Sequence, residues 1–192
     1  YKRQAYKIPV VILLSKIDLQ GAEAVAAFRA VYEGAGYEVL EVSATDGTGV
    51  ERVRELLAGC RTLVSGNSGV GKSTLIRTID PTLDIRTGEI SESHHKGRHT
   101  TTFSTMYPLA GGGAVIDTPG IKGFGLIDID DAELWHYFPE MMRTAPGCRF
   151  YNCTHTHEPG CAVIEAVRRG DISPARYESY LKILDEDDKY RK

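Results

Sequence analysis

The segment from Gly66 to Ser73 constrains the fold of this chain more than any other. It fits the pattern G-x-x-x-x-G-K-[ST] and lies between an apolar stretch at 61–65 and a helical pattern at 72–79. Glycines let the backbone curl so that successive N–H groups face phosphate oxygens, and the helix N-terminus adds partial positive charge. We therefore expect a nucleoside triphosphate site, with Lys72 on the β- and γ-phosphates and the Ser73 hydroxyl on Mg²⁺. The residues of this expected site are Gly66, Asn67, Ser68, Gly69, Val70, Gly71, Lys72, Ser73 and Thr74.

Strand and helix patterns alternate around this loop. The run at 8–14 is continuously apolar, which predicts a strand buried on both faces of a parallel sheet. Two further strands and a hairpin are predicted at 37–42, 61–65 and 103–116, with helices at 22–32, 50–57 and 72–79. This alternation indicates an α/β fold with a doubly wound, mostly parallel sheet. Beyond about residue 129 only helices are predicted, at 131–137, 162–169 and from 174 to about 184, so we divide the chain into domains at 1–128 and 129–192.

Composition narrows the function classes. The chain has 192 residues, enough for one domain and a small appendage, and 42% hydrophobic with 26% charged residues indicates a globular protein. No apolar run approaches the roughly 20 residues of a membrane span, so we expect no membrane association. A net charge of −3 argues against coating nucleic acid by bulk electrostatics. Because Tyr1 stands only a few residues before the first predicted strand, we expect an upstream domain to be missing.

A second acidic element follows the predicted strand at 114–116. Asp117 and Gly120 form a D-x-x-G pattern, in which the aspartate approaches Mg²⁺ through water and the glycine N–H approaches the γ-phosphate. The pattern alone is typical of a plain turn. Together with the upstream phosphate loop, it predicts that Asp117 helps to bind the metal.

Two short elements indicate guanine as the base. Ser15, Lys16, Ile17 and Asp18 resemble the [NT]-K-x-D motif, whose aspartate accepts two hydrogen bonds from guanine N1–H and the 2-amino group. Adenine lacks that donor pair and would leave a carboxylate unpaired. Ser43 and Ala44 end the next strand and resemble the S-A-x element that contacts guanine O6. These elements disfavour the alternative of a P-loop kinase or ATPase. The first element departs from the usual motif, because Ser15 replaces asparagine or threonine at its first position.

Three of the four cysteines lie within fourteen residues. Cys148, Cys153 and Cys161, with His155 or His157, offer the four ligands of a closed structural zinc site. Such clustering favours a metal site in a reducing compartment, the cytoplasm, over a disulfide framework. Cys60 stands apart, and we expect it to be a small core residue on its strand. A zinc-containing RNA-binding module with a vestigial nucleotide site is the alternative from another functional class.

The order of the motifs points to a family. The guanine elements precede the phosphate loop, whereas in ordinary GTPases they follow it, which is possible because a site of this kind needs only loops gathered at the carboxyl ends of parallel strands. This permuted order, with Gly97–Thr102 (GRHTTT) and Asp117–Gly120 (DTPG), resembles the small ribosomal subunit biogenesis GTPase family, RsgA. A permuted GTPase for the large ribosomal subunit is a closer alternative, but such proteins resemble this chain without the cysteine cluster.

The resemblance implies a fold, an activity and partners. The implied arrangement is an N-terminal OB-fold, absent from this chain, then the permuted GTPase and a zinc domain with His155 as its fourth ligand. The implied function is hydrolysis of GTP to GDP during late maturation of the 30S subunit, stimulated by that subunit and its rRNA. We expect a monomer with GTP or GDP, Mg²⁺ and one structural Zn²⁺.

The catalytic group of such a GTPase must lie outside the D-x-x-G element. Ile121 occupies the position where many GTPases carry a water-orienting glutamine. The resemblance makes His99 the candidate instead, while His94 and His95 are expected to be solvated. Comparison with other G-domains favours Thr101 among Thr100–Thr102 as a further Mg²⁺ ligand.

Overall fold

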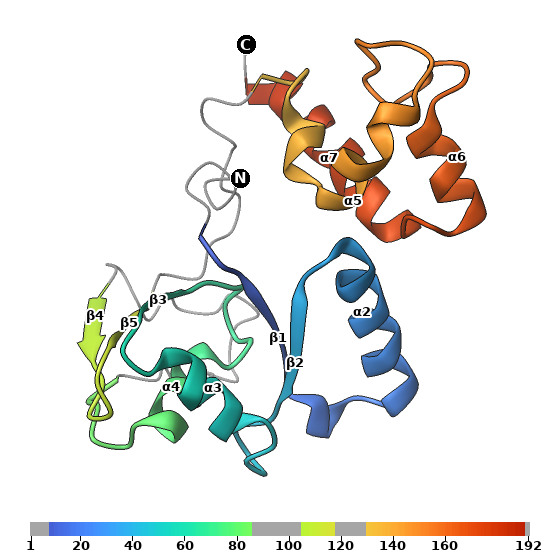
Figure 1. Cartoon of the computed structure of the whole chain (residues 1–192). Helices are drawn as coiled ribbons and strands as arrows, with labels where there is room; N and C mark the ends of the chain where they lie inside the picture. The colour runs from blue at the N-terminus through green and yellow to red at the C-terminus, as the bar shows by residue number, and fades with distance from the viewer. Residues whose placement is uncertain (1–7, 86–104, 118–129, 191–192) are drawn as a thin grey trace. The chain divides into compact units, whose positions relative to one another are not determined.

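A computed structural model describes residues 8–85, 105–117 and 130–190, with side chains described as far as residue 185 (Figure 1). The alternating strands and helices before residue 118 confirm the expected α/β class. In this part the elements are β1 (Val11–Ser15), η1 (Ile17–Leu19), α2 (Ala22–Ala35), β2 (Glu38–Val42), α3 (Val50–Leu57), β3 (Arg61–Val64), α4 (Lys72–Ile79), β4 (Thr105–Pro108) and β5 (Ala114–Asp117). The rest of the described chain is helical, with η2 (Leu134–Tyr137), α5 (Pro139–Thr144), η3 (Ala145–Gly147), α6 (Ala162–Arg169) and α7 (Pro174–Tyr190).

The chain divides into two compact units. The first unit comprises residues 1–12, 26–39 and 125–192, and the second comprises residues 13–25 and 40–124. Both α2 and β2 contribute residues to each unit. The domain boundary expected after residue 128 falls at the edge of the segment 118–129, outside the described residues, and stays a prediction.

The second unit contains the strands that end at the phosphate loop and at Asp117. β3 and β5 pair in parallel with Val64 opposite Asp117, and β4 pairs with β5 antiparallel, which confirms the predicted hairpin. The described strands form two sheets, β1-β2 and β3-β5-β4. Aliphatic side chains of α3, α4, the strands and the segment after α4 form the core of this unit, comprising Val42, Val50, Val53, Leu57, Leu75, Ile76, Ile79, Ile85 and Val115.

Two expectations about burial were wrong. β1 is half-buried along its whole length rather than buried on both faces, because in the described part of the chain its sheet contains only β1 and β2. Cys60 is exposed, because it lies in the turn between α3 and β3 and not on the strand. The backbone of Cys60 is nevertheless fixed, since its carbonyl accepts a hydrogen bond from the N–H of Ala114 at 2.8 Å.

The helical module, defined as residues 130–190, has its own core. Tyr180, Val163 and Met141 are almost completely buried there, and the ring of Phe138 meets that of Tyr180 edge-on with centroids 5.5 Å apart. The predicted helix at 131–137 is a shorter 3₁₀ turn, η2, since Pro139 opens a separate helix, α5, that the sequence analysis missed. α6 has the predicted bounds, and α7 continues to Tyr190. Among the helices of the described ranges, none is both long and apolar enough to cross a membrane.

Candidate functional site

The phosphate loop leaves β3 and enters α4. Gly69 and Gly71 have φ angles of +80° and +98°, in the left-handed region that glycine adopts without strain. Gly71 is the N-cap of α4, so the loop turns directly into the helix N-terminus. The predicted glycine pattern therefore produces the curled backbone that phosphate binding requires.

Lys72 lies across the loop that precedes it. Its Nζ donates to the carbonyl oxygens of Gly66 at 2.7 Å and Asn67 at 3.0 Å. Ser73 is half-buried in the first turn of α4, and Thr74 beside it is exposed. The ammonium group and the hydroxyl predicted to bind phosphate and metal thus stand together at one helix N-terminus.

The guanine element at the end of β1 contacts the phosphate loop directly. Ser15 Oγ donates to the carbonyl of Val70 at 2.8 Å, and Lys16 Nζ donates to that of Gly69 at 2.8 Å. These pairs are 55 and 53 residues apart in sequence. The structure therefore brings together the two motifs whose permuted order suggested the fold.

Ser15 has a role that the sequence analysis missed. It treated the serine as a weakened replacement for asparagine or threonine, but its hydroxyl holds the phosphate loop. A hydroxyl at the end of a strand was the available signal, and only the long-range contact with Val70 reveals its use. Ile17 and Asp18 follow in η1, where the Asp18 carboxylate is exposed.

Ser43 shapes the second guanine element. It is fully buried, and its Oγ accepts hydrogen bonds from the backbone N–H groups of Thr45 at 3.3 Å and Asp46 at 3.4 Å. The carbonyl of the adjacent Ala44 lies 3.5 Å from Thr78 Oγ1 on α4, whose hydroxyl donates to the Thr74 carbonyl at 3.0 Å. The second guanine element therefore lies beside the helix that follows the phosphate loop.

Asp117 lies at the same sheet edge as the phosphate loop. It ends β5 with 2% of its surface exposed, opposite Val64, the last residue of β3. The register thus places the carboxylate beside the point where the phosphate loop begins. His99, Thr101 and Gly120, predicted to act in hydrolysis, lie outside the described residues, so their roles stay predictions.

The four predicted zinc ligands form a cluster in the helical module. The ligand atoms of Cys148, Cys153, His155 and Cys161 all lie within 4.8 Å of one another. His155 Nδ1 is 3.6 Å from Cys148 Sγ and 3.5 Å from Cys161 Sγ, and these two sulfurs are 4.0 Å apart. A tetrahedral zinc with ordinary bond lengths requires about 3.6 Å between nitrogen and sulfur and about 3.8 Å between sulfurs. The residues therefore fit a tetrahedral metal, with His155 Nδ1 as the ligand atom.

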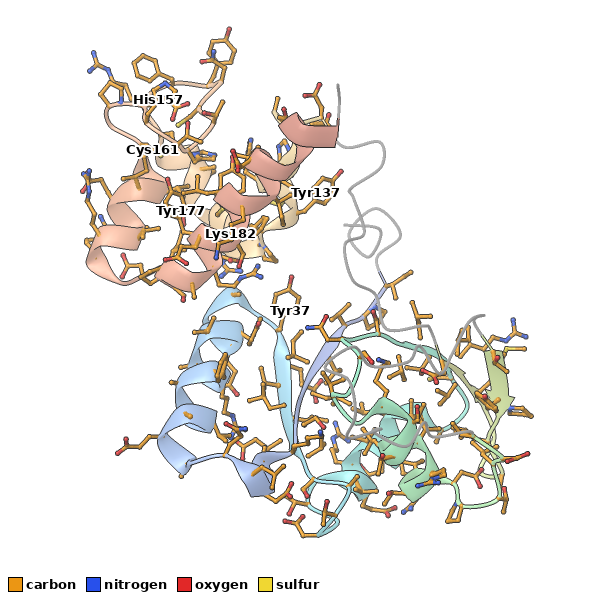
Figure 2. The ribbon with its side chains drawn as sticks, turned by 180° about the vertical axis from the view of Figure 1, so that it is seen from behind. Tyr37, Tyr137, His157, Cys161, Tyr177 and Lys182 are labelled. Carbon is orange, nitrogen blue, oxygen red and sulfur yellow. The ribbon has the colours of Figure 1, made fainter. Side chains whose placement is uncertain are left out.

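The chemistry of the cluster supports the same conclusion. Burial lowers the pKa of His155, which favours the neutral imidazole that can bind a metal. Burial also raises the pKa of Cys153 to about 12, so a thiolate at this position requires a cation beside it. His157, the alternative fourth ligand, is exposed and bonds to Thr156 Oγ1 at 2.8 Å instead (Figure 2).

Side chains around the cluster hold residues 148–161, called the ligand loop below, in place. Burial acts to raise the pKa of Glu158, but hydrogen bonds from Thr154 and neighbouring backbone N–H groups outweigh it and keep that pKa well below its usual range. Tyr177 and Tyr180 on α7 donate their hydroxyls to the carbonyls of His155 at 2.7 Å and Thr154 at 2.6 Å. These contacts fix His155 in a left-handed conformation, with φ of +58°.

Comparison with known proteins identifies the family of the chain. A sequence model of the RsgA GTPase family matches residues 2–127. The chain belongs to this family. Two proteins named small ribosomal subunit biogenesis GTPase RsgA, from Porphyromonas gingivalis and Bacteroides fragilis, are 51% and 49% identical over 98% of the chain. The chain spans 62% of the length of each of these relatives.

Two solved structures share the fold. The crystal structure of YjeQ from Thermotoga maritima matches 96% of this chain and 62% of that one, with a TM-score of 0.78 and 34% identity. YloQ, described as a circularly permuted GTPase, matches 95% of this chain and 58% of that one, with a TM-score of 0.72 and 27% identity. The permuted α/β fold predicted from motif order is thus confirmed.

Proposed function

We propose that this chain binds GTP with Mg²⁺ and hydrolyses it to GDP and phosphate during late maturation of the 30S ribosomal subunit. The docking of Ser15 and Lys16 on the phosphate loop is the observation that carries the proposal. It joins a base-recognition element to a triphosphate cradle in one site. Asp117 at the adjoining strand end completes the set needed for a metal-bound triphosphate.

Different residues have different roles in the proposed hydrolysis. Backbone N–H groups of the loop and Lys72 hold the phosphates and neutralise charge that develops on them. Asp18 accepts from guanine, with Lys16 covering the base. Ser73, Asp117 and Thr101 would hold Mg²⁺, which would supply further charge neutralisation when bound. His99 orients the attacking water, since the chain has no glutamine after the D-x-x-G element.

The cysteine cluster is proposed to hold one structural zinc. Its four side chains supply a complete tetrahedral set, which leaves no position for a reacting water. Buried cysteines without a disulfide partner fit a reducing compartment, and we propose that the protein acts in the cytoplasm as a monomer.

The names of the relatives support a ribosomal partner. Those proteins are called small ribosomal subunit biogenesis GTPases, and we propose the 30S subunit and its rRNA as partners of this one. Because the relatives are longer than the chain, we propose that an N-terminal OB-fold outside it makes many of the ribosomal contacts.

The test is nucleotide hydrolysis by this chain with and without 30S subunits, with ATP and 50S subunits as controls. We expect slow hydrolysis of GTP and no hydrolysis of ATP. Turnover of GTP should rise when 30S subunits are added but not when 50S subunits are added, and Lys72→Ala should abolish it. Lys182→Ala is the matched control, since that lysine lies on the exposed surface of α7. Hydrolysis that persists in Lys72→Ala would exclude this site, and equal use of ATP would favour a P-loop ATPase. If 30S subunits failed to stimulate even the full-length protein, the proposed partner would be wrong.

A further inference from the structure

Two arginines of the helical module hold the corner between α2 and β2. Arg143 on α5 donates from Nη2 to the carbonyl of Gly34 at 3.1 Å and from Nη1 to that of Ala35 at 3.3 Å. Both carbonyls belong to the last turn of α2, whose final carbonyls have no partner within the helix and carry partial negative charge. The guanidinium therefore caps the C-terminus of α2, and all these residues belong to the first unit.

Arg176 on α7 supports the same corner. Its Nε donates to Glu140 Oε1 at 2.7 Å, and only 4% of the Glu140 side chain is exposed. The guanidinium lies 4.8 Å from the ring centre of Phe138 and 5.8 Å from that of Tyr37, the residue between α2 and β2 labelled in Figure 2. The buried carboxylate and the two rings hold Arg176 in one orientation against the corner.

α2 buries little apolar surface. Ala35 is its only buried residue, and 60% of Phe28 on the same helix is exposed. Arg176 lines a cavity of about 220 Å³, to which α2 contributes Ala30, Val31 and Gly34. Since α2 has so little buried apolar surface, the two arginines provide a large share of what holds its C-terminal end.

The corner is connected along the chain to both guanine elements, through α2 to one and through β2 to the other. α2 begins three residues after η1, which carries Asp18, and β2 ends at Val42, directly before Ser43. A tilt of α2 or a shift of β2 at the corner is therefore transmitted along these elements to the loops at their other ends. The loop of Ser15–Asp18 and the loop of Ser43–Ala44 would change their spacing.

We infer that Arg143 and Arg176 are positioning residues for guanine recognition. By fixing the α2–β2 corner, they set the distance between the two loops that contact the base. Their effect on the phosphate loop is smaller, because neither α2 nor β2 leads into it and the loop is reached indirectly, through the side chains of Ser15 and Lys16. This inference rests on the proposed function, since it concerns the base-binding half of that site.

The test compares two ligands of the zinc-loaded chain. Fluorescent GDP requires both base and phosphate contacts, whereas inorganic tripolyphosphate, added as a competitor, uses the phosphate loop alone. We expect Arg143→Ala to weaken GDP binding about three- to tenfold, where tenfold corresponds to about 1.4 kcal/mol, with a clearly smaller loss of affinity for tripolyphosphate. Arg143→Lys should restore part of the loss, because a lysine keeps the charge but not the fork that reaches two carbonyls.

A second variant tests the same contact from its other side. Gly36 has a φ of +95°, and a Cβ there would lie 3.2 Å from Arg143 Nη1, so Gly36→Ala should weaken GDP binding in the same selective way. Arg149→Ala is the control, since that side chain lies over Phe150 on the ligand loop. Zinc content and melting temperature verify that each variant is folded.

The outcomes separate the two proposals. Unchanged GDP affinity in both corner variants, or an equal loss of tripolyphosphate affinity, would overturn the positioning role. Failure of the parent chain to bind GDP at all would instead overturn the proposed function.

Discussion

The hydroxyl of Tyr180 should control how readily the ligand loop opens. Tyr180 is fully buried on α7, and its hydroxyl donates to the carbonyl of Thr154 at 2.6 Å, between the predicted zinc ligands Cys153 and His155. Tyr180→Phe keeps the ring, with its edge-on contact to Phe138, and removes only this hydrogen bond. Loss of one hydrogen bond of this kind lowers the free energy of opening the loop by about 1 kcal/mol. The population of the opened loop should therefore rise roughly fivefold.

Two measurements report how often the ligand loop opens. The first is the rate at which the zinc-loaded protein transfers its metal to an excess of a chromogenic chelator. The second is hydrogen exchange at the backbone N–H groups of Thr154, Thr156 and His157, which donate to Glu158 in the closed loop. Both rates should rise by similar factors, because both require the loop to leave α7.

Tyr151→Phe is the matched control, since Tyr151 is fully exposed on the same loop and loses the same atom. Tyr177→Phe, which removes a 2.7 Å bond to the His155 carbonyl from a half-buried side chain, should have a smaller effect. If Tyr180→Phe released metal and exchanged hydrogen at the parent rate, the hydroxyl would not hold the loop. The account of how α7 stabilises the cluster would then be wrong.

Three further predictions concern the second unit. Asp18→Asn should move nucleotide preference from guanine toward xanthine, because the amide can donate to the O2 that xanthine carries in place of the amino group; an unchanged preference in competition binding would contradict the proposed base contact. The N–H of Ala110 donates to the Asp80 carboxylate at 2.8 Å and is the main cause that holds the pKa of Asp80 below its usual value. Because this stabilisation is present above the unfolded-state pKa and is lost as pH falls through the folded-state pKa, Asp80→Asn should lower the melting temperature at pH 7, and the difference should shrink below about pH 4; a difference independent of pH would exclude this role. Gly113 has a φ of +87°, and a Cβ there would lie 2.6 Å from the carbonyl oxygen of Cys60, so Gly113→Ala should lower the free energy of unfolding by about 1–3 kcal/mol in urea titrations. A variant as stable as the parent would show that the hairpin turn can move away from Cys60.

Local sequence signals predicted much of the fold. The bounds of α3, α4 and α6 agree with the predicted ranges, because each has apolar residues at helical spacing and a clear start or stop signal. Gly71 starts α4 and Gly170 ends α6, both in the left-handed conformation. Such signals lie within a few residues of the element they define, so no tertiary information is needed to find them.

Burial was harder to predict, because it depends on which elements pack together. The apolar sequence of β1 indicated a strand covered on both faces, whereas the described strand is half-buried. Cys60 has the small apolar side chain of a core residue but lies in an exposed turn. The ligand pattern had the same limit, since the sequence spacing alone allowed either His155 or His157. Burial and the distances to two sulfurs favour His155.

The contact between the guanine element and the phosphate loop explains why a serine suffices at the start of that element. A trans peptide group directs its carbonyl and the following N–H to opposite sides. When Ser15 holds the carbonyl of Val70 and Lys16 holds that of Gly69, the N–H groups of Gly71 and Val70 point away from these donors. In that direction they can face phosphate oxygens. The position therefore needs one donor that reaches the loop, and a hydroxyl provides it as well as an amide. Base recognition and the shape of the phosphate loop are coupled through these two carbonyls, so the order of the motifs along the chain can change without loss of the site.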